Sequence, residues 1–238
     1  IWQLVQKWCI PQVDMAITVS ESLGKVLGEK YNNYFRQIYN APSLDAYKNL
    51  GVTQDESDPF ILYQGVLNKG RGLEAIIDAM EWIDGVRLVI AGEGDLSQEL
   101  KSRAAKSKVS ERITFVGWLM PNELRKLTVR ATLGLNLLDG SSLNYYYSLA
   151  NKFFDYMHAG VPSLNMDFPE YKHLTEQYDI GYLIDSLDPN TIANAINEAL
   201  KDKPKYEQKK INCYKAAQEF NWENEGEMIN NLLFDVCH

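Results

Sequence analysis

The strongest constraint on the fold is an alternation, beginning near Pro59, between short apolar or β-branched runs and segments with helical periodicity. One such segment places Leu73, Ile76 and Met80 at helical spacing. Because strands that alternate with helices form parallel sheets joined by right-handed crossovers, the sequence predicts a Rossmann-like α/β fold with helices flanking the sheet. The predicted strands lie at 60–64, 86–91, 112–116, 133–138, 161–165 and 181–184.

The residues before this alternation form a separate predicted unit. A strand at 14–19, a helix capped by Ser20 and a strand at 35–39 precede a stretch rich in proline, glycine and acids, which is typical of a linker. The chain also begins at Ile1 rather than at a methionine, so we expect a fragment of a longer protein. The predicted parts are residues 1–40, a remnant of a preceding domain; 41–58, a linker; 59–220, the main domain; and 221–238, a returning amphipathic helix.

Composition excludes several classes of protein. With 45% hydrophobic and 24% charged residues the chain is that of a globular protein, and its net charge of -8 disfavours nucleic-acid binding. The three cysteines are widely spaced, so we expect neither a disulfide framework nor a metal cluster, and a reduced cytoplasmic setting. No apolar run approaches the roughly 20 residues that cross a bilayer, and no secretory signal precedes the first helix.

The turn after the first strand of the main domain is the first candidate for chemistry. In GVLNKGRGLEAI, Gly65, Gly70 and Gly72 keep side chains away from the start of a helix, and Lys69 and Arg71 stand beside it. Helix N–H groups and cations suit a diphosphate. An equally open interpretation is a loop that needs glycine for its backbone conformation, with solvated cations.

A helix beginning at Ser148 is the second candidate. Ser148 is the predicted cap, Leu149, Phe153 and Met157 form one apolar stripe, and Gly160 ends the helix. The free N–H groups of its first turn would suit a phosphate.

Asp155 lies off that stripe, with Lys152 three residues earlier. A carboxylate here can accept two hydrogen bonds from a ribose diol. The alternative is a Lys152–Asp155 surface ion pair, worth a few tenths of a kcal/mol. His158 and His173 are isolated from other metal-binding side chains, so we expect no metal site.

Taken together and in order, these segments resemble the retaining GT-B glycosyltransferases of group 1, over nearly the whole chain. DMAITVSESL with IYNAPS resembles the last strand and helix of that group's N-terminal domain, and ILYQGVLNKGRGLEAIIDAM its first C-domain strand and phosphate loop. RLVIAGEG and RITFVGWLMPNEL resemble its next two strands, and SLANKFFDYMHAGVPSLN the helix of its two-acid motif. The resemblance implies the C-terminal, nucleotide-sugar-binding domain of a GT-B enzyme with a remnant of the acceptor-side domain.

The resemblance also implies roles for individual residues. Asp155 takes the place of the second acid and would bind the ribose hydroxyls, while Arg71 would neutralise the diphosphate. The backbone from Ser148 to Ala150 would face the phosphates, and the turn at Val116 and Gly117 would line the base. The implied catalytic residues are Arg71 and Lys152; the implied donor-binding residues are Gly65, Lys69, Gly70, Arg71, Gly92, Val116, Gly117, Tyr147, Ser148, Leu149, Ala150 and Asp155.

Two positions depart from the group's pattern. Tyr147 stands where the first acid is expected, and Val66 where an arginine follows the glycine after the strand. Either Lys152 or Lys69 then supports the sugar and phosphate, or the site is altered in specificity or activity.

The resemblance implies transfer, with retention, of a sugar from a nucleotide-diphosphate sugar to a saccharide or lipid-linked acceptor, in cell-surface polysaccharide or glycolipid synthesis. The implied transfer reaction requires no cofactor or metal. We expect this donor-binding half to be inactive alone, to reach the inner membrane face only through the absent domain, and to form a homodimer through its unpaired strand edges. The alternatives are a non-catalytic nucleotide-sugar-binding or scaffolding subunit, or a GT-B-fold nucleotide-sugar epimerase.

Overall fold

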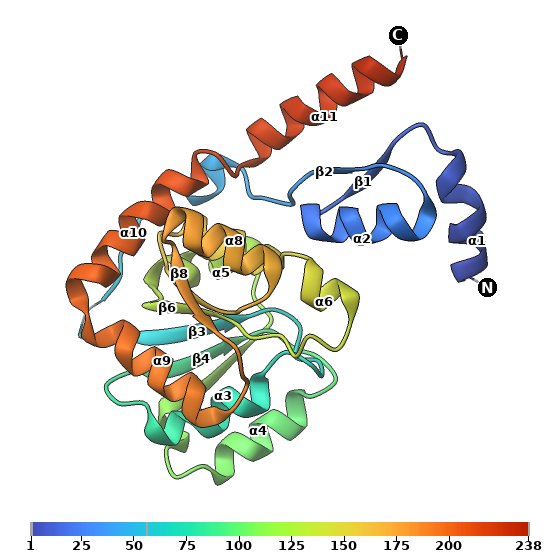
Figure 1. Cartoon of the computed structure of the whole chain (residues 1–238). Coiled ribbons are helices and arrows are strands. Elements are labelled where there is room, and N and C mark those ends of the chain that lie inside the picture. Colours follow the sequence, from blue (N-terminus) through green and yellow to red (C-terminus); the bar gives the residue numbers. More distant parts are fainter. Residues whose placement is uncertain (1, 56, 238) are drawn as a thin grey trace.

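The main sheet is built from the apolar runs that the sequence predicted as strands. The computed structural model describes residues 2–55 and 57–237; Ile1, Glu56 and His238, which fall in the predicted remnant, linker and returning helix, lie outside the described residues. All strand pairs of the main sheet are parallel, in the order β5-β4-β3-β6-β7-β8 (Figure 1). The strands are β3 (Phe60–Gln64), β4 (Arg87–Ala91), β5 (Ile113–Gly117), β6 (Leu133–Asn136), β7 (Ser163–Met166) and β8 (Gly181–Ile184), so the predicted strands are confirmed with small shifts of their ends.

Helices cover both faces of this sheet, which explains why its central strands are buried throughout. One face packs against α3 (Leu73–Ala79), α4 (Ser97–Lys106) and α9 (Pro189–Lys201), and together they form the largest apolar core. The other face packs against α5 (Pro121–Arg130), α7 (Asn151–His158) and α8 (Pro169–Tyr178). Two helices that the sequence analysis did not predict are α6 (Leu143–Tyr147) and α10 (Lys203–Ala217).

The strand order reverses between β3 and β6. The chain winds outward from β3 to β5, returns to the centre at β6 and then winds outward to β8. Crossover connections leave in opposite directions at such a point, so the carboxyl ends of the two central strands border an open crevice. The topology therefore places the ends of β3 and β6, and the loops that follow them, where a ligand site is expected.

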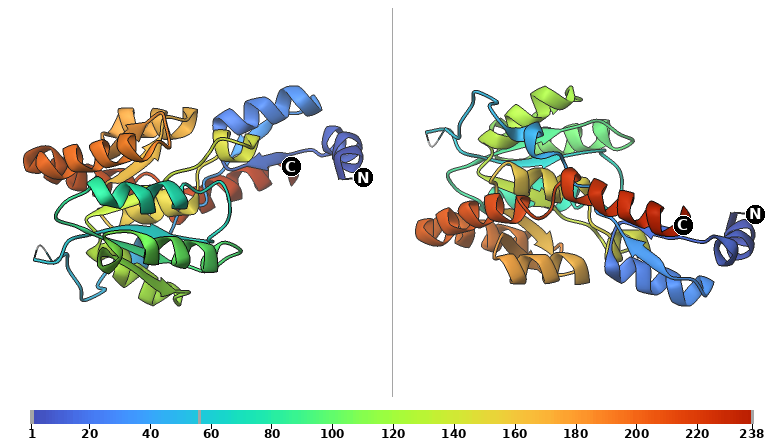
Figure 2. Two further views of the ribbon diagram at one scale, coloured as in Figure 1. Left: turned by 90° about the horizontal axis from the view of Figure 1, so that it is seen from below. Right: turned by 90° about the horizontal axis from the view of Figure 1, so that it is seen from above.

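The N-terminal unit contains α1 (Trp2–Cys9), β1 (Ala16–Thr18), α2 (Glu21–Tyr31) and β2 (Phe35–Gln37). β1 and β2 pair in parallel, and the Ser20 hydroxyl accepts a hydrogen bond from the amide of Leu23, so the predicted cap is confirmed. The unit lies beyond the end of the main sheet, on the side toward which α11 (Trp222–Cys237) projects (Figure 2). None of the described helices combines the length and the apolar character needed to cross a membrane.

The predicted linker is partly structured. It contains the 3-10 helix η2 (Leu44–Tyr47), and its main chain is fastened to the start of α11. The amide of Trp222 donates to the carbonyl of Pro42, and the Glu223 carboxylate accepts from the amide of Leu44. These bonds hold η2 in place beside the main domain.

Candidate functional site

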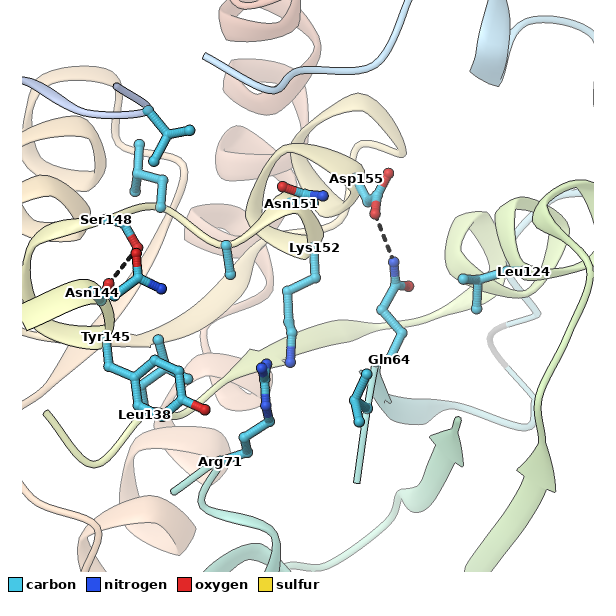
Figure 3. A pocket seen from close by; sticks show the side chains of 15 residues that line it. Gln64, Arg71, Leu124, Leu138, Asn144, Tyr145, Ser148, Asn151, Lys152 and Asp155 are labelled. Carbon is cyan, nitrogen blue, oxygen red and sulfur yellow. Dashed lines mark hydrogen bonds between the residues drawn. The ribbon is translucent and has the colours of Figure 1, made fainter. Parts of the chain in front are cut away.

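A cavity of 450 Å³ opens at the carboxyl end of β3, beside the start of α7, where the strand order reverses (Figure 3). It brings together the phosphate-loop candidates and the α7 candidates, which lie about 80 residues apart in the sequence. The lining residues are Val19, Gln64, Gly65, Val66, Arg71, Leu124, Leu138, Asn144, Tyr145, Ser148, Leu149, Ala150, Asn151, Lys152 and Asp155.

Two cations point toward one another in this cavity. Figure 3 shows the ammonium of Lys152, from the start of α7, facing the guanidinium of Arg71, which comes from the loop before α3. Lys152 is only 6% exposed, and its Nζ lies 3.8 Å from the centroid of the Tyr63 ring. Arg71 lies over the ring of Tyr145, with its Cζ 5.4 Å from the centroid. The aromatic rings support both cations but neutralise neither.

Within the part of the chain that the structure describes, no carboxylate forms an ion pair with either cation. Lys152 Nζ and Arg71 Nε are buried, and each has no hydrogen-bond partner among the residues that the structure describes. Burial and the neighbouring charge of Arg71 hold the pKa of Lys152 well below its ordinary value, against the opposing attraction of Asp155. Buried positive charge without a partner is costly, so this end of the cavity is suited to an anion.

The alternative of a solvent-exposed Lys152–Asp155 pair is wrong, because the Asp155 carboxylate has other partners. Its Oδ1 accepts from the Tyr47 hydroxyl at 2.9 Å, and its Oδ2 accepts from Gln64 Nε2 at 3.0 Å. Burial raises the pKa of Asp155, while these two hydrogen bonds and the charges of Arg125 and Lys152 act in the opposite direction.

Neither partner of this carboxylate is among the site residues predicted from the sequence. Gln64 is the last residue of β3, so its place at a strand end beside the crevice was a usable signal. Tyr47 is 108 residues from Asp155 in the sequence and lies in the predicted linker, where no local pattern marks it.

The predicted cap of the second candidate helix is wrong. Ser148 ends α6 instead of starting α7, because its amide and its hydroxyl both donate to the carbonyl of Asn144. The amide of Ala150 is also engaged, since it donates to the Tyr171 hydroxyl at 2.8 Å. Two of the main-chain donors expected to face phosphates are therefore already bonded within the protein.

The start of α7 still presents free amides. The first hydrogen bond of the helix runs from the amide of Phe153 to the carbonyl of Ala150, at 2.9 Å. The N–H groups of Asn151 and Lys152 precede this bond and so have no partner within the helix. The main-chain donors at this helix N-terminus are thus those of Asn151 and Lys152 rather than those of Ser148 and Ala150, and both residues line the cavity.

The remaining predicted binding residues do not line this cavity; they are Lys69, Gly70, Gly92, Val116, Gly117 and Tyr147. Gly92 has a structural reason of its own, because a Cβ atom there would lie 1.9 Å from the carbonyl oxygen of Gly65. Its amide donates to the carbonyl of Gly117 at 2.8 Å, which joins the turns after β4 and β5. The Tyr147 ring packs edge-on against Tyr146, with centroids 4.8 Å apart.

Comparison with known proteins adds to this geometry. Residues 51–216 match the family model described as glycosyl transferases group 1. The chain is 24% identical over 82% of its length to a soluble starch synthase 2-3 of Oryza sativa subsp. indica, and covers 26% of that protein. It is 25% identical over 90% of its length to the putative glycosyltransferase EpsD of Bacillus subtilis, and covers 57% of it.

A solved structure shares the fold. The crystal structure of Anabaena Alr3699/HepE in complex with UDP and glucose superposes with a TM-score of 0.80 at 18% identity, over 94% of this chain and 64% of that one. The likeness confirms the fold that the sequence analysis expected. The chain thus spans about a quarter of the rice enzyme and less than two thirds of the solved one.

Proposed function

We propose, from the premise that the chain belongs to the glycosyl transferases group 1, that the cavity between β3 and α7 binds a nucleoside-diphosphate sugar whose sugar is transferred to an acceptor hydroxyl. The observation that carries the proposal is the buried ammonium of Lys152 beside the half-buried guanidinium of Arg71, neither of which pairs with a carboxylate among the described residues. UDP and glucose bound to HepE support a donor of this chemical class.

The arrangement suits the charge that develops during such a transfer. Breaking the bond between the anomeric carbon and the phosphate oxygen leaves an extra negative charge on the nucleoside diphosphate and positive charge on the sugar. Fixed cations at Arg71 and Lys152, and the free amides at the start of α7, would stabilise the departing diphosphate without reorganising. The family's arginine is absent here, because Val66 occupies its position. In this scheme Lys152 supplies the positive charge instead, whereas Lys69 is exposed and does not supply it.

The opposite end of the cavity suits a ribose. Asp155 Oδ1 and Oδ2 each accept one hydrogen bond within the protein and keep one lone-pair site for a hydroxyl. A nucleotide would then lie with its ribose at Asp155 and its diphosphate at Lys152, which are one helical turn apart on α7.

We propose retention of the anomeric configuration and a saccharide or lipid-linked acceptor, as the family resemblance implies.

Calorimetric titration with a ligand series tests the diphosphate assignment. Affinity is expected to rise steeply from uridine to UMP to UDP, because each phosphate adds charge at the two cations; GDP and ADP series identify the preferred base. Equal affinity along every series, or no binding of any nucleoside diphosphate, would contradict the proposal.

We further propose that residues 1–238 transfer no sugar by themselves, and sugar transfer by this chain alone would overturn that part.

One observation favours a second candidate, a non-catalytic nucleotide-binding module. Tyr147 stands where the family's first acid is expected, and its ring packs against Tyr146 outside the lining of the cavity. A donor site should discriminate among UDP-glucose, UDP-galactose and UDP-N-acetylglucosamine, whereas a module that recognises only the nucleotide should bind all three as it binds UDP.

A further inference from the structure

We propose that Tyr47 is a positioning residue that holds the Asp155 carboxylate in the orientation that accepts the ribose hydroxyls of the bound nucleotide. Tyr47 belongs to the 3-10 helix η2, which lies between β2 and β3 along the chain. The inference rests on the proposed function, since it assigns a role to a residue behind that site. It also gives the stretch between the two sheets a part in donor binding.

The carboxylate is held from two sides by residues of different elements. The Tyr47 hydroxyl donates to Oδ1 from η2, and Gln64 Nε2 donates to Oδ2 from the end of β3. Gln64 is contacted in turn by the buried Thr128 hydroxyl, which lies 2.8 Å from Gln64 Oε1 and 2.7 Å from the carbonyl of Leu124 and shares its one proton between these two acceptors. Two donors on the two oxygens prevent rotation of the carboxylate about its χ2 angle.

This arrangement leaves room for a diol. An ionised carboxylate offers about four lone-pair sites, and the two protein donors use one on each oxygen. Asp155 can therefore accept two further hydrogen bonds at a fixed orientation. Pre-orientation reduces the entropy lost when the ribose binds.

The charge of Asp155 depends on the same contact. Burial raises the pKa of the Asp155 carboxyl; the groups that oppose this are Tyr47 on η2, Arg125 on α5, Gln64 on β3 and Lys152 on α7. Removal of the Tyr47 hydroxyl is therefore expected to raise the pKa of Asp155 further.

Tyr47 remains a hydrogen-bond donor throughout the neutral range. Burial and the neighbouring Asp155 raise its own pKa well above the ordinary value. Further titratable groups near it are Arg125 of α5 and Tyr156 and His158 of α7. The centroid of the His158 ring lies 5.9 Å from that of Tyr47, and burial lowers the pKa of His158. The lowered pKa of His158 favours its neutral form, and its Nε2 lies 2.7 Å from the carbonyl of Phe220, so it does not compete for the contact.

The test compares Tyr47→Phe with the wild type in UDP titrations from pH 4.5 to 8. We expect about tenfold weaker binding at neutral pH, since a hydrogen bond to a charged group is lost. The acid limb of the binding profile should move to higher pH, and the preference for UDP over 2′,3′-dideoxy-UDP should shrink. Tyr178→Phe is the matched control: the Tyr178 hydroxyl donates to Glu219 at 2.6 Å, outside the cavity lining, so binding should not change.

A second replacement keeps the test valid if Tyr47→Phe does not fold. 3-Fluorotyrosine at position 47 preserves the ring and makes its hydroxyl a stronger donor, so the acid limb should move to lower pH. Unchanged affinity, acid limb and diol preference in these variants would overturn the role of Tyr47 and leave the proposed function standing. Failure of the wild-type chain to bind any nucleoside diphosphate would overturn both.

Discussion

Replacing Lys152 by Met should make the protein more stable while weakening nucleotide binding. Lys152 is 6% exposed, its ammonium has no hydrogen-bond partner among the described residues, and it faces Arg71. Exchange of buried ionic groups for well-packed apolar side chains of similar volume is often neutral or stabilises proteins by about 1–4 kcal/mol, and an unpaired buried ammonium has no Coulomb attraction to lose. The contact with the Tyr63 ring, 3.8 Å from Nζ, offsets about 0.5–2 kcal/mol of this gain.

The net expectation is a gain of about 1–2 kcal/mol in the free energy of unfolding, which raises the melting temperature by about 2–8 °C in a chain of this size. Binding should change in the opposite direction. A charge-assisted hydrogen bond to a diphosphate contributes about 1.5–3 kcal/mol, so UDP should bind about 10- to 150-fold more weakly. Thermal unfolding followed by circular dichroism, and calorimetric titration with UDP, measure the two effects.

The pH dependence of the stability gain gives an independent check. The unfolded chain keeps the Lys152 proton up to about its ordinary pKa of 10.5, whereas the folded protein releases it at lower pH. Between the lowered pKa and 10.5 the unfolded state binds more protons, so wild-type stability rises with pH through this window. The Met variant lacks that rise, and its advantage should shrink as the pH approaches 10.

Lys209→Met is the matched control, because Lys209 is equally buried but its ammonium is hydrogen-bonded to Asp179. This variant should gain no stability and should bind UDP as the wild type does. The reasoning fails if Lys152→Met melts at a lower temperature than the wild type and binds UDP unchanged.

Two further predictions concern the loops at the carboxyl ends of the strands. Arg71→Gln should weaken UDP binding at least tenfold and leave uridine binding unchanged. The control in the same titrations is Arg103→Gln, which removes a surface ion pair with Asp78 and should not change UDP binding. Gly92→Ala should lower the free energy of unfolding, measured in urea, by about 3–5 kcal/mol, because the new Cβ atom would overlap the carbonyl of Gly65. Gly85 also has a positive φ, but a Cβ atom there would meet no atom within 4 Å, so Gly85→Ala should lower it by only about 1–2 kcal/mol. Equal costs for the two alanine variants would show that close packing at Gly92 is not decisive.

Features that depend on a few neighbouring residues were predictable from the sequence. The alternation of apolar runs and helical segments determined the six parallel strands, because each strand and its following helix bury apolar side chains within the same short unit. The cap at Ser20 and the left-handed glycine at Gly160 were also predicted correctly, since both reflect local main-chain hydrogen bonding.

Local patterns failed where two acceptable signals competed or where the pattern was weak. Ser148 has the chemistry of a helix cap, but the preceding helix α6 captures its hydroxyl. The helix α10 was missed because its sequence is rich in lysine, and only a few small or aromatic residues, such as Cys213 and Ala216, are buried. Packing against the rest of the domain decides such cases.

The candidate site itself shows what only tertiary structure could decide. Local sequence patterns connected Lys152 with Asp155 on one helix, and only the family resemblance connected them with Arg71; the reversal of strand order is what brings all three to one cavity. One of the two hydrogen-bond donors to Asp155 is Tyr47, which lies 108 residues away in a stretch whose sequence is typical of a linker. The burial of Lys152 with no carboxylate partner in the described part of the chain likewise follows from its packing over Tyr63 of β3, because the dielectric environment of a side chain depends on everything that excludes water around it.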